Sequence, residues 1–327
     1  MSEALNGGTV LVTGANGFVG RALVAHLLHR HDHDVVAGVR RPEANVPTGV
    51  EKRTVPALGP DADWTAALAG IDQVVHAAAR VHVMDETEAD PLTAFRRVNT
   101  QGTLALAEQA AKAGVRRFVF ISSIKVNGEQ TRRGQPFEAD QPARPTDPYG
   151  ISKYEAEQGL LQLARTTGMD VVVVRPVLVY GPGVGANMAS LMRWLVRGVP
   201  LPLGAIDNRR SLVSLANLVD FITVCLNHPE AANQVFLVSD GEDLSTSDLL
   251  RRMSHALGRR PRLLPVPATW LALVARLMGK AGVAQRLLGS LQVDIEKNRR
   301  RLGWQPAVPV DEALQATAHP FLESRRR

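Results

Sequence analysis

The chain alternates between short runs of β-branched residues and longer stretches rich in Ala and Leu, and this alternation restricts the fold more than any other feature. It is typical of stacked βαβ units around a parallel sheet. We expect buried strands at residues 9–13, 34–39, 73–77, 117–121, 170–175 and 235–238. Helices are expected at 19–30, 92–113, 149–166, 245–257 and 268–279. The pattern predicts an α/β fold, a Rossmann-type doubly wound parallel sheet with a smaller, mostly helical C-terminal lobe.

The alternation weakens after residue 176, where Gly and Pro punctuate a loop-rich segment, and one further buried strand follows at 235–238. We therefore predict a dinucleotide-binding domain over residues 1–178, to which residues 211–240 return. Residues 179–210 and 241–327 would form a substrate-binding lobe.

A glycine-rich turn joins the first expected strand to the first expected helix. Gly14, Gly17 and Gly20 are spaced G-x-x-G-x-x-G, a variant of the dinucleotide fingerprint. Glycines permit a tight turn and a close approach of the backbone to a pyrophosphate, and the N-terminus of the following helix favours negative charge. The placement predicts a dinucleotide site.

The end of the second expected strand bears on the choice of dinucleotide. An NAD-selecting site places an acidic residue there, whereas this chain has Val39-Arg40-Arg41-Pro42. Guanidinium groups suit the 2′-phosphate of NADP, although a solvated basic turn is the alternative. The sequence favours NADP(H) and leaves NAD(H) possible.

Tyr149 and Lys153 form a Tyr-x-x-x-Lys pair in a chain with only three tyrosines. On a helix these positions share one face, so the ammonium group is expected near the phenol ring. A nearby cation favours phenolate and lowers the pKa of a tyrosine, which then exchanges protons near neutral pH. The pair predicts a general acid–base site. A packed tyrosine beside a solvated lysine is the alternative.

Composition excludes several classes of protein. The one cysteine, Cys225, permits no internal disulfide and favours a reducing, cytoplasmic location. A net charge of +6 would suit nucleic acid, but Lys and Arg are spread along the chain, so anionic small substrates explain the excess and nucleic acid is not expected. The apolar stretch 266–278 is too short for stable membrane insertion. His29, His31 and His33 read as a polar loop, and no metal site is expected.

With these motifs, the chain resembles the extended short-chain dehydrogenase/reductase family over nearly its full length. Within that family it is most similar to the nucleotide-sugar branch around UDP-galactose 4-epimerase. Besides the glycine turn and the Tyr–Lys pair, the resemblance rests on His76-Ala77-Ala78-Ala79, on Val98-Asn99-x-x-Gly102-Thr103 and on Ser122-Ser123.

The resemblance implies roles for individual residues. The catalytic residues would be Ser123, Tyr149 and Lys153. The dinucleotide would contact Gly14, Asn16, Gly17, Phe18, Val19, Gly20, Arg40, Arg41, Ala77, Ala78, Ala79, Asn99, Lys153 and Pro176. The UDP-sugar would contact Lys125, Asn187, Met188, Arg210 and Arg286, with His82 in a position where either a sugar contact or a structural role fits.

Departures from the family pattern divide the functional hypotheses. Ala57 stands where epimerases carry an Asp that contacts adenine, and Leu178 stands where they carry an Asn. Ile124-Lys125 replaces the Asp-Glu of the 4,6-dehydratases, which argues against dehydration. The favoured reading is an NADP(H)-dependent enzyme reducing a UDP-2-acetamido-4-keto-6-deoxyhexose for surface polysaccharide synthesis. The alternatives are a UDP-sugar 4-epimerase with bound NAD and a non-catalytic NADP-binding regulator.

Assembly is a further expectation from the resemblance. Helices like those expected at 92–113 and 149–166 pair across a two-fold axis in this family. Leu104, Leu106, Leu160, Leu161 and Leu163 supply apolar surface on these two segments. A self-complementary patch is enough for a closed dimer, so we expect a homodimer.

Overall fold

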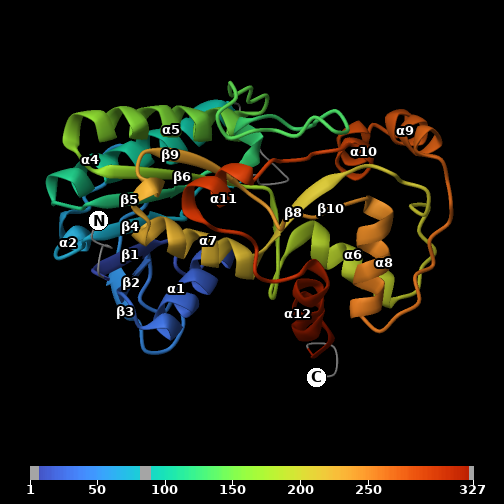
Figure 1. Ribbon diagram of the computed structural model, residues 1–327, viewed down its shortest axis with the longest axis horizontal. Helices are drawn as coiled ribbons and strands as arrows, with labels where there is room; N and C mark the ends of the chain where they lie inside the picture. Colours follow the sequence, from blue (N-terminus) through green and yellow to red (C-terminus); the bar gives the residue numbers. More distant parts are fainter. Residues whose placement is uncertain (1–6, 82–89, 324–327) are drawn as a thin grey trace.

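A seven-stranded sheet forms the centre of the protein, as the computed structural model shows for residues 7–81 and 90–323 (Figure 1). Its strand order is β3-β2-β1-β4-β5-β6-β9, and every neighbouring pair is parallel. The strands are β1 (Thr9–Thr13), β2 (Asp34–Val39), β3 (Glu51–Thr54), β4 (Gln73–His76), β5 (Arg117–Ile121), β6 (Asp170–Pro176) and β9 (Gln234–Val238). The Rossmann-type fold predicted from the alternation is confirmed.

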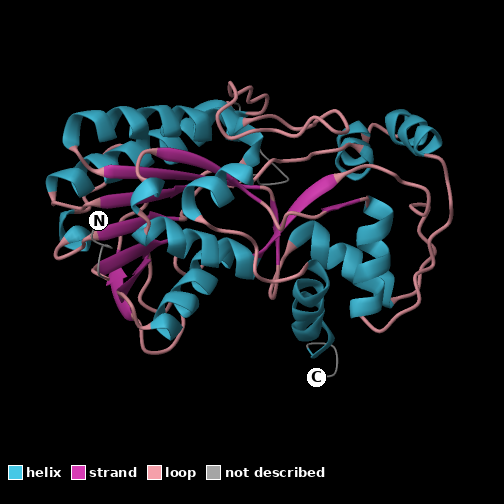
Figure 2. Cartoon of the chain, viewed as in Figure 1, coloured by secondary structure: helices cyan, strands magenta, loops and turns pink. Residues whose placement is uncertain are grey.

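Helices cover both faces of this sheet (Figure 2). On one face, α1 (Phe18–Arg30), α7 (Leu215–Asn227) and α11 (Glu296–Leu302) pack in one apolar cluster with the strands. On the other, α2 (Thr65–Leu68), α4 (Gly102–Lys112) and α5 (Pro148–Thr167) pack in a second cluster. Apart from β3 at the edge, the strands are buried on both faces, which explains their continuous rather than alternating apolar runs.

The helix expected at 92–113 is divided into three parts. α3 (Pro91–Phe95) is followed by a π-helix, η1 (Arg96–Gln101), and then by α4. The π-helix places Asn99 in the interior, where its side chain is buried. Wider turns of this kind often occur at functional sites.

A smaller lobe is built on a three-stranded sheet with the order β10-β8-β7. β8 (Arg210–Ser214) is parallel to β7 (Leu178–Tyr180) and antiparallel to β10 (Asp243–Leu244). The core of this lobe is a third apolar cluster. Its helices are α6 (Ala186–Val196), α8 (Thr246–Ala256), α9 (Ala268–Leu277), α10 (Ala281–Leu288) and α12 (Val310–Glu323). Two short 3₁₀ turns, η2 (Ile124–Val126) after β5 and η3 (Pro229–Ala231) before β9, belong to the larger domain.

The expected strands lie within about one residue of the observed ones, but several elements of the large sheet and its covering helices were missed, among them β3, α7 and α11. β3 reads Glu-Lys-Arg-Thr and lies mostly exposed at the sheet edge, so it lacks the apolar signal of the other strands. α7 lies in the returning segment 211–240, for which only a strand was expected. The division at residues 178, 210 and 240 remains a proposal.

Within residues 7–81 and 90–323, none of the helices has both the length and the apolarity needed to cross a bilayer. Over the same residues, no group of three or more His, Cys, Asp or Glu side chains is arranged to bind a metal ion.

Candidate active site

The glycine turn lies at the carboxyl end of β1, where the strand order of the sheet reverses between β1 and β4. Gly14 has φ of +67°, and a Cβ added there would lie 2.8 Å from the backbone nitrogen of Ala78. A Cβ on Gly20 would lie 2.2 Å from the carbonyl oxygen of Gly14. Neither position can hold a side chain, so the backbone itself forms the floor of this crevice.

α1 begins beside the turn with its first N–H groups available to a ligand. Gly17 is the residue before the helix, and it has no side chain that could cap it. A helix N-terminus without a side-chain cap has free donors that suit a phosphate. Asn16 is exposed at the turn, while Phe18 and Val19 are half-buried and pack against the apolar cluster of this face. The site therefore fits a dinucleotide.

His76 supports the second wall of the crevice rather than reacting. Its two ring nitrogens lie 2.7 Å from Thr13 Oγ1 and 3.1 Å from Thr103 Oγ1. Burial, with a smaller effect of the nearby Lys153 ammonium, lowers the pKa of His76 to about 3, so the ring is neutral. Ala77 and Ala79, which follow it, line the cavity described below.

The Asn99 side chain links the loop after β4 to the first turns of α5. It accepts a hydrogen bond from the Arg80 N–H at 2.8 Å and donates to the Arg80 carbonyl at 3.0 Å. It also donates to Ser152 Oγ at 3.1 Å, on the first turns of α5. Asn99 therefore holds the loop after β4 against α5, and the dinucleotide contact expected of it stays a prediction.

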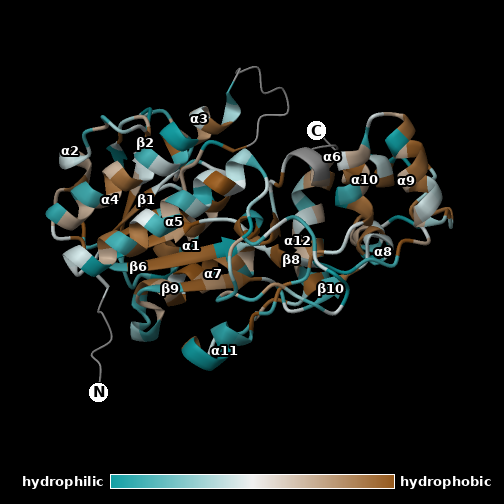
Figure 3. Ribbon diagram, turned by 90° about the horizontal axis from the view of Figure 1, so that it is seen from above, coloured by the Kyte–Doolittle hydropathy of each residue, from teal (hydrophilic) through white to brown (hydrophobic). Residues whose placement is uncertain are grey.

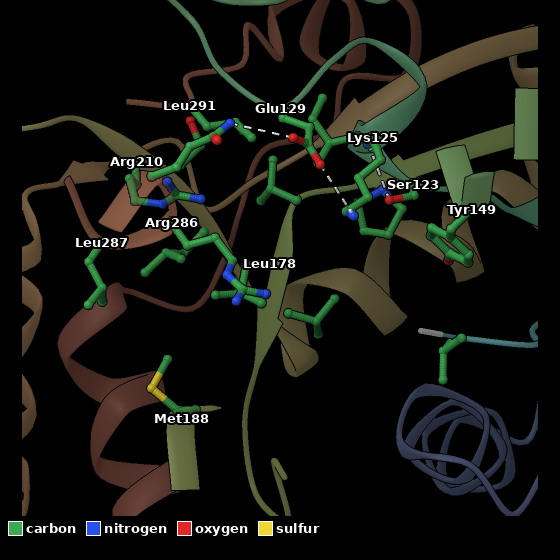
Figure 4. Close-up of a pocket in the computed structure, with 18 of the residues that line it drawn as sticks. Ser123, Lys125, Glu129, Tyr149, Leu178, Met188, Arg210, Arg286, Leu287 and Leu291 are labelled. Carbon is green, nitrogen blue, oxygen red and sulfur yellow. Dashed lines mark hydrogen bonds and ion pairs between the residues drawn. The ribbon is translucent and has the colours of Figure 1, made fainter. Parts of the chain in front are cut away.

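Ser123, Tyr149 and Lys153 line one cavity of about 800 Å³ between the two lobes (Figure 4). α5 begins at the acidic cap Asp147, whose carboxylate accepts the Gly150 N–H at 2.6 Å. A Cβ on Gly150 would lie 2.8 Å from the Lys125 carbonyl, so this glycine lets α5 pack closely against η2. The three residues predicted to be catalytic therefore line the same cavity, and their catalytic role stays a prediction.

The expected direction of the Tyr149 pKa shift is wrong for this structure. Burial, together with the Asp147 carboxylate, raises the pKa of Tyr149 to about 12. The Lys153 ammonium instead donates to the Ile121 carbonyl at 2.9 Å and lies 4.4 Å from the centre of the Phe120 ring. Burial lowers the pKa of Lys153 to about 7, with Glu157 acting in the opposite direction. At neutral pH, Tyr149 is therefore in its proton-donating form.

A buried polar network beneath these residues was missed by the sequence reading. The Glu157 carboxylate accepts a hydrogen bond from Ser122 Oγ and hydrogen bonds from the Arg175 guanidinium at 2.9 and 2.5 Å. Arg175 also donates to Asn127 Oδ1 at 2.9 Å. Glu157 lies one turn beyond Lys153 on the same helix, and this i+4 spacing is the only sequence signal that could have found it.

The opposite end of the cavity is basic. Arg210, from β8, and Arg286, from α10, both point into it (Figure 4). Arg210 donates to the Gly289 carbonyl at 3.0 Å, and burial lowers its pKa from the usual arginine value. Two guanidinium groups in one cavity suit a diphosphate. Met188, the other predicted contact on this side, is buried and lines the same cavity.

The remaining predicted residues are placed less directly. Lys125 lines the cavity, but its ammonium forms ion pairs with Asp147 and, at 3.6 Å, with Glu129. Pro176 lines the wall shared with the dinucleotide crevice. His82 lies outside the described residues, and nothing is described for the side chain of Asn187. Glu129 and Gln285 line the cavity without having been predicted.

Arg40 and Arg41 follow β2 at the same edge of the sheet as the glycine turn. Both are exposed, and among the residues that the structure describes neither has a side-chain partner. Their position agrees with the prediction, while the position alone does not select between the two nicotinamide dinucleotides.

The model of the NAD dependent epimerase/dehydratase family matches residues 10–239. The chain belongs to this family. It is 48% identical over 320 residues to a UDP-glucose 4-epimerase from Vibrio cholerae, an alignment that covers 98% of this chain and 97% of that protein.

Two solved structures share its fold. UDP-glucose 4-epimerase from Thermotoga maritima, with UDP-glucose, has a TM-score of 0.77 at 22% identity, over 97% of this chain and 99% of that chain. MoeE5 in complex with UDP-glucose and NAD has a TM-score of 0.74 at 26% identity, over 97% and 100% of the two chains.

Proposed function

We propose that the protein interconverts UDP-sugars that differ in configuration at C4, as a UDP-sugar 4-epimerase that keeps NAD bound. The observation that carries this proposal is one cavity with Ser123 and Tyr149 at one end and Arg210 and Arg286 at the other. A nucleotide diphosphate held by the two arginines would extend its sugar toward the tyrosine. The UDP-glucose 4-epimerase from Vibrio cholerae, 48% identical, supports the same reaction.

The side chains divide the chemistry among them. Bound NAD supplies reversible acceptance of hydride from C4 of the sugar. When hydride leaves C4, Tyr149 would accept the proton of the 4-hydroxyl as the phenolate, a form that positive charge in the site must favour against burial, and the proton returns when the hydroxyl is formed again. Ser123 holds that oxygen by a hydrogen bond, and Lys153 orients the cofactor ribose and supplies positive charge beneath the site. Residues of both lobes line the cavity, and the many apolar side chains among them would limit the access of water to the intermediate ketone.

A 4-ketoreductase is the second candidate, because Arg40 and Arg41 are exposed at the end of β2 and residues 39–42 contain no carboxylate. Two guanidinium groups there would favour NADPH and net reduction of a UDP-4-keto sugar, a step in surface polysaccharide synthesis. The NAD present in the MoeE5 complex supports NAD for this chain instead.

Incubation of the purified protein with UDP-glucose and with UDP-N-acetylglucosamine distinguishes the epimerase from the reductase. Sugar interconversion followed by chromatography, with no net change in reduced-nicotinamide absorbance, supports the epimerase. Stoichiometric NADPH consumption with a UDP-4-keto sugar, and no interconversion, would replace it with the reductase. Tyr149→Phe serves as the control for contaminating activity in both assays.

We also propose a cytoplasmic homodimer paired through α4 and α5. Leu161 and Leu163 remain half-buried on α5, whereas Leu106 and Leu160 are buried in the protein's own core. Light scattering decides the matter, since a single chain has a mass of 35.4 kDa. A mass near that value at micromolar concentration would reject the dimer.

A further inference from the structure

The helical hairpin formed by α9 and α10 exposes an unusually large apolar surface. The two helices pack on each other at the end of the molecule opposite α2, and within the described part of the chain neither contributes a buried residue (Figures 1 and 3). Trp270 is 64% exposed and Leu277 is 79% exposed. We call this set the hairpin surface: Trp270, Leu273, Val274, Leu277, Met278 and Val283.

Most of the large apolar side chains that the described residues expose belong to this one surface. Scattered exposed apolar residues need no explanation, but a contiguous group marks an interaction site. α9 is attached to the lobe by Ala268 and Leu271, which pack against its apolar cluster. One face of α9 therefore packs against the lobe, and its exposed apolar residues lie on the opposite face.

The charge around the hairpin surface points to the chemistry of its partner. The sequence has no Asp or Glu between Asp248 and Asp294. Over the same stretch, the exposed basic residues Arg276 and Lys280 lie on the hairpin itself, and Arg259, Arg260 and Arg262, also exposed, precede it in the chain. A second copy of this face would bring basic side chains against basic side chains, which is unfavourable. An anionic surface that accepts apolar side chains satisfies both features.

We propose that the α9–α10 hairpin docks this protein on the surface of an anionic lipid bilayer. Trp and Leu on one side of a short helix enter the boundary between headgroups and acyl chains, while Lys and Arg bind the lipid phosphates. Docking is peripheral, because the described helices are too short or too polar to span the bilayer. The inference concerns a surface and is independent of which reaction the cavity performs.

Docking would also place the substrate cavity beside the membrane. α10 carries Gln285 and Arg286, which line the cavity, while Val283 on the same helix belongs to the hairpin surface. The helix that contacts lipid is thus also a wall of the substrate site, and the enzyme would act at the bilayer surface.

Co-sedimentation with vesicles tests the proposal, using phosphatidylcholine alone and phosphatidylcholine with about one third phosphatidylglycerol. The full-length protein should sediment with the anionic vesicles and be released by high salt. Each basic residue near an anionic surface contributes about fivefold to binding, so Arg276→Gln/Lys280→Gln should bind roughly 25-fold more weakly. The matched control Arg299→Gln/Arg300→Gln removes two exposed charges from α11 and should change binding much less.

The apolar part is tested by Trp270→Ser/Leu277→Ser, which should weaken vesicle binding at least tenfold while turnover of a soluble UDP-sugar is unchanged. These side chains are exposed, so the variant should fold, and circular dichroism verifies this. Absence of wild-type binding to anionic vesicles would overturn the proposal. So would equal losses in the two charge variants, or a dimer mass that this apolar variant reduces to that of a single chain, which would assign the surface to a second copy.

Discussion

Replacing Glu157 by Gln should destabilise the folded protein strongly. The Glu157 and Arg175 side chains are 0% and 5% exposed, and their closest nitrogen–oxygen distance is 2.5 Å. The isosteric amide keeps the volume but removes the charge, and it turns an N–H group toward donors of Arg175 or Ser122. Breaking a buried ion pair by removing one partner costs about 3–5 kcal/mol, because the other charge stays buried. We expect a loss of that size in the free energy of unfolding.

Urea unfolding followed by circular dichroism measures this loss, with Asp207→Asn as the matched control. Asp207 and Arg133 are 2.7 Å apart, at nearly the same distance, but their side chains are 70% and 57% exposed. An exposed pair contributes about 0–1 kcal/mol, so the control should shift the midpoint little. The double variant Glu157→Leu/Arg175→Met should recover much of the loss, because neither charge of the pair is left buried without its partner.

The reasoning is refuted if Glu157→Gln lowers the free energy of unfolding no more than Asp207→Asn does, with the slope against urea concentration unchanged.

The same variant should also change how stability depends on pH, an electrostatic effect that a loss of packing would not produce. Glu157 raises the pKa of Lys153 against burial, which lowers it to about 7 from 10.5. Between these values the unfolded chain holds a proton that the folded chain lacks, so stability rises with pH across this window. Without Glu157, the lower limit of the window should move further down.

Three further outcomes test the site. Tyr149→Phe keeps the ring and removes the proton donor, so turnover should fall by about 10²–10⁴-fold while nicotinamide binding persists, and near-normal turnover would exclude the acid–base role. The pKa of His76 is lowered from 6.5 to about 3, so its contribution to stability is present above pH 6.5 and lost toward pH 3. His76→Gln should flatten that slope in urea titrations by up to about 1.4 kcal/mol per pH unit, and an unchanged slope would contradict it. Arg40→Ala/Arg41→Ala should weaken NADPH binding at least tenfold and NADH binding little; equal losses for both would show that neither guanidinium lies near the 2′-position.

Sequence alone was enough for the parts of the protein that depend on local patterns. Runs of β-branched residues at a regular spacing predicted six of the sheet strands, because a strand covered on both faces must be apolar throughout. Gly14 and Gly20 were recognisable because their positions exclude a side chain. The i+4 spacing of Tyr149 and Lys153 placed both on one face of a helix, and the structure brings both into the cavity.

Pairings between distant residues could not be read from those patterns. Glu157 and Arg175 lie on different elements, and their ion pair exists only because α5 packs across β6. The pKa of Tyr149 was predicted in the wrong direction, because the spacing indicates which group is near but not how deeply both are buried, and here burial decides the shift.

Helix α9 shows most clearly what the sequence determines and what only the tertiary structure determines. Its composition predicted a helix, and the helix is present at Ala268–Leu277. The same apolar residues would serve equally well in a core, and only the assembled lobe leaves Trp270 and Leu277 in solvent. The periodicity of a sequence determines which residues share a face, whereas the neighbours brought there by the rest of the chain determine whether that face is covered.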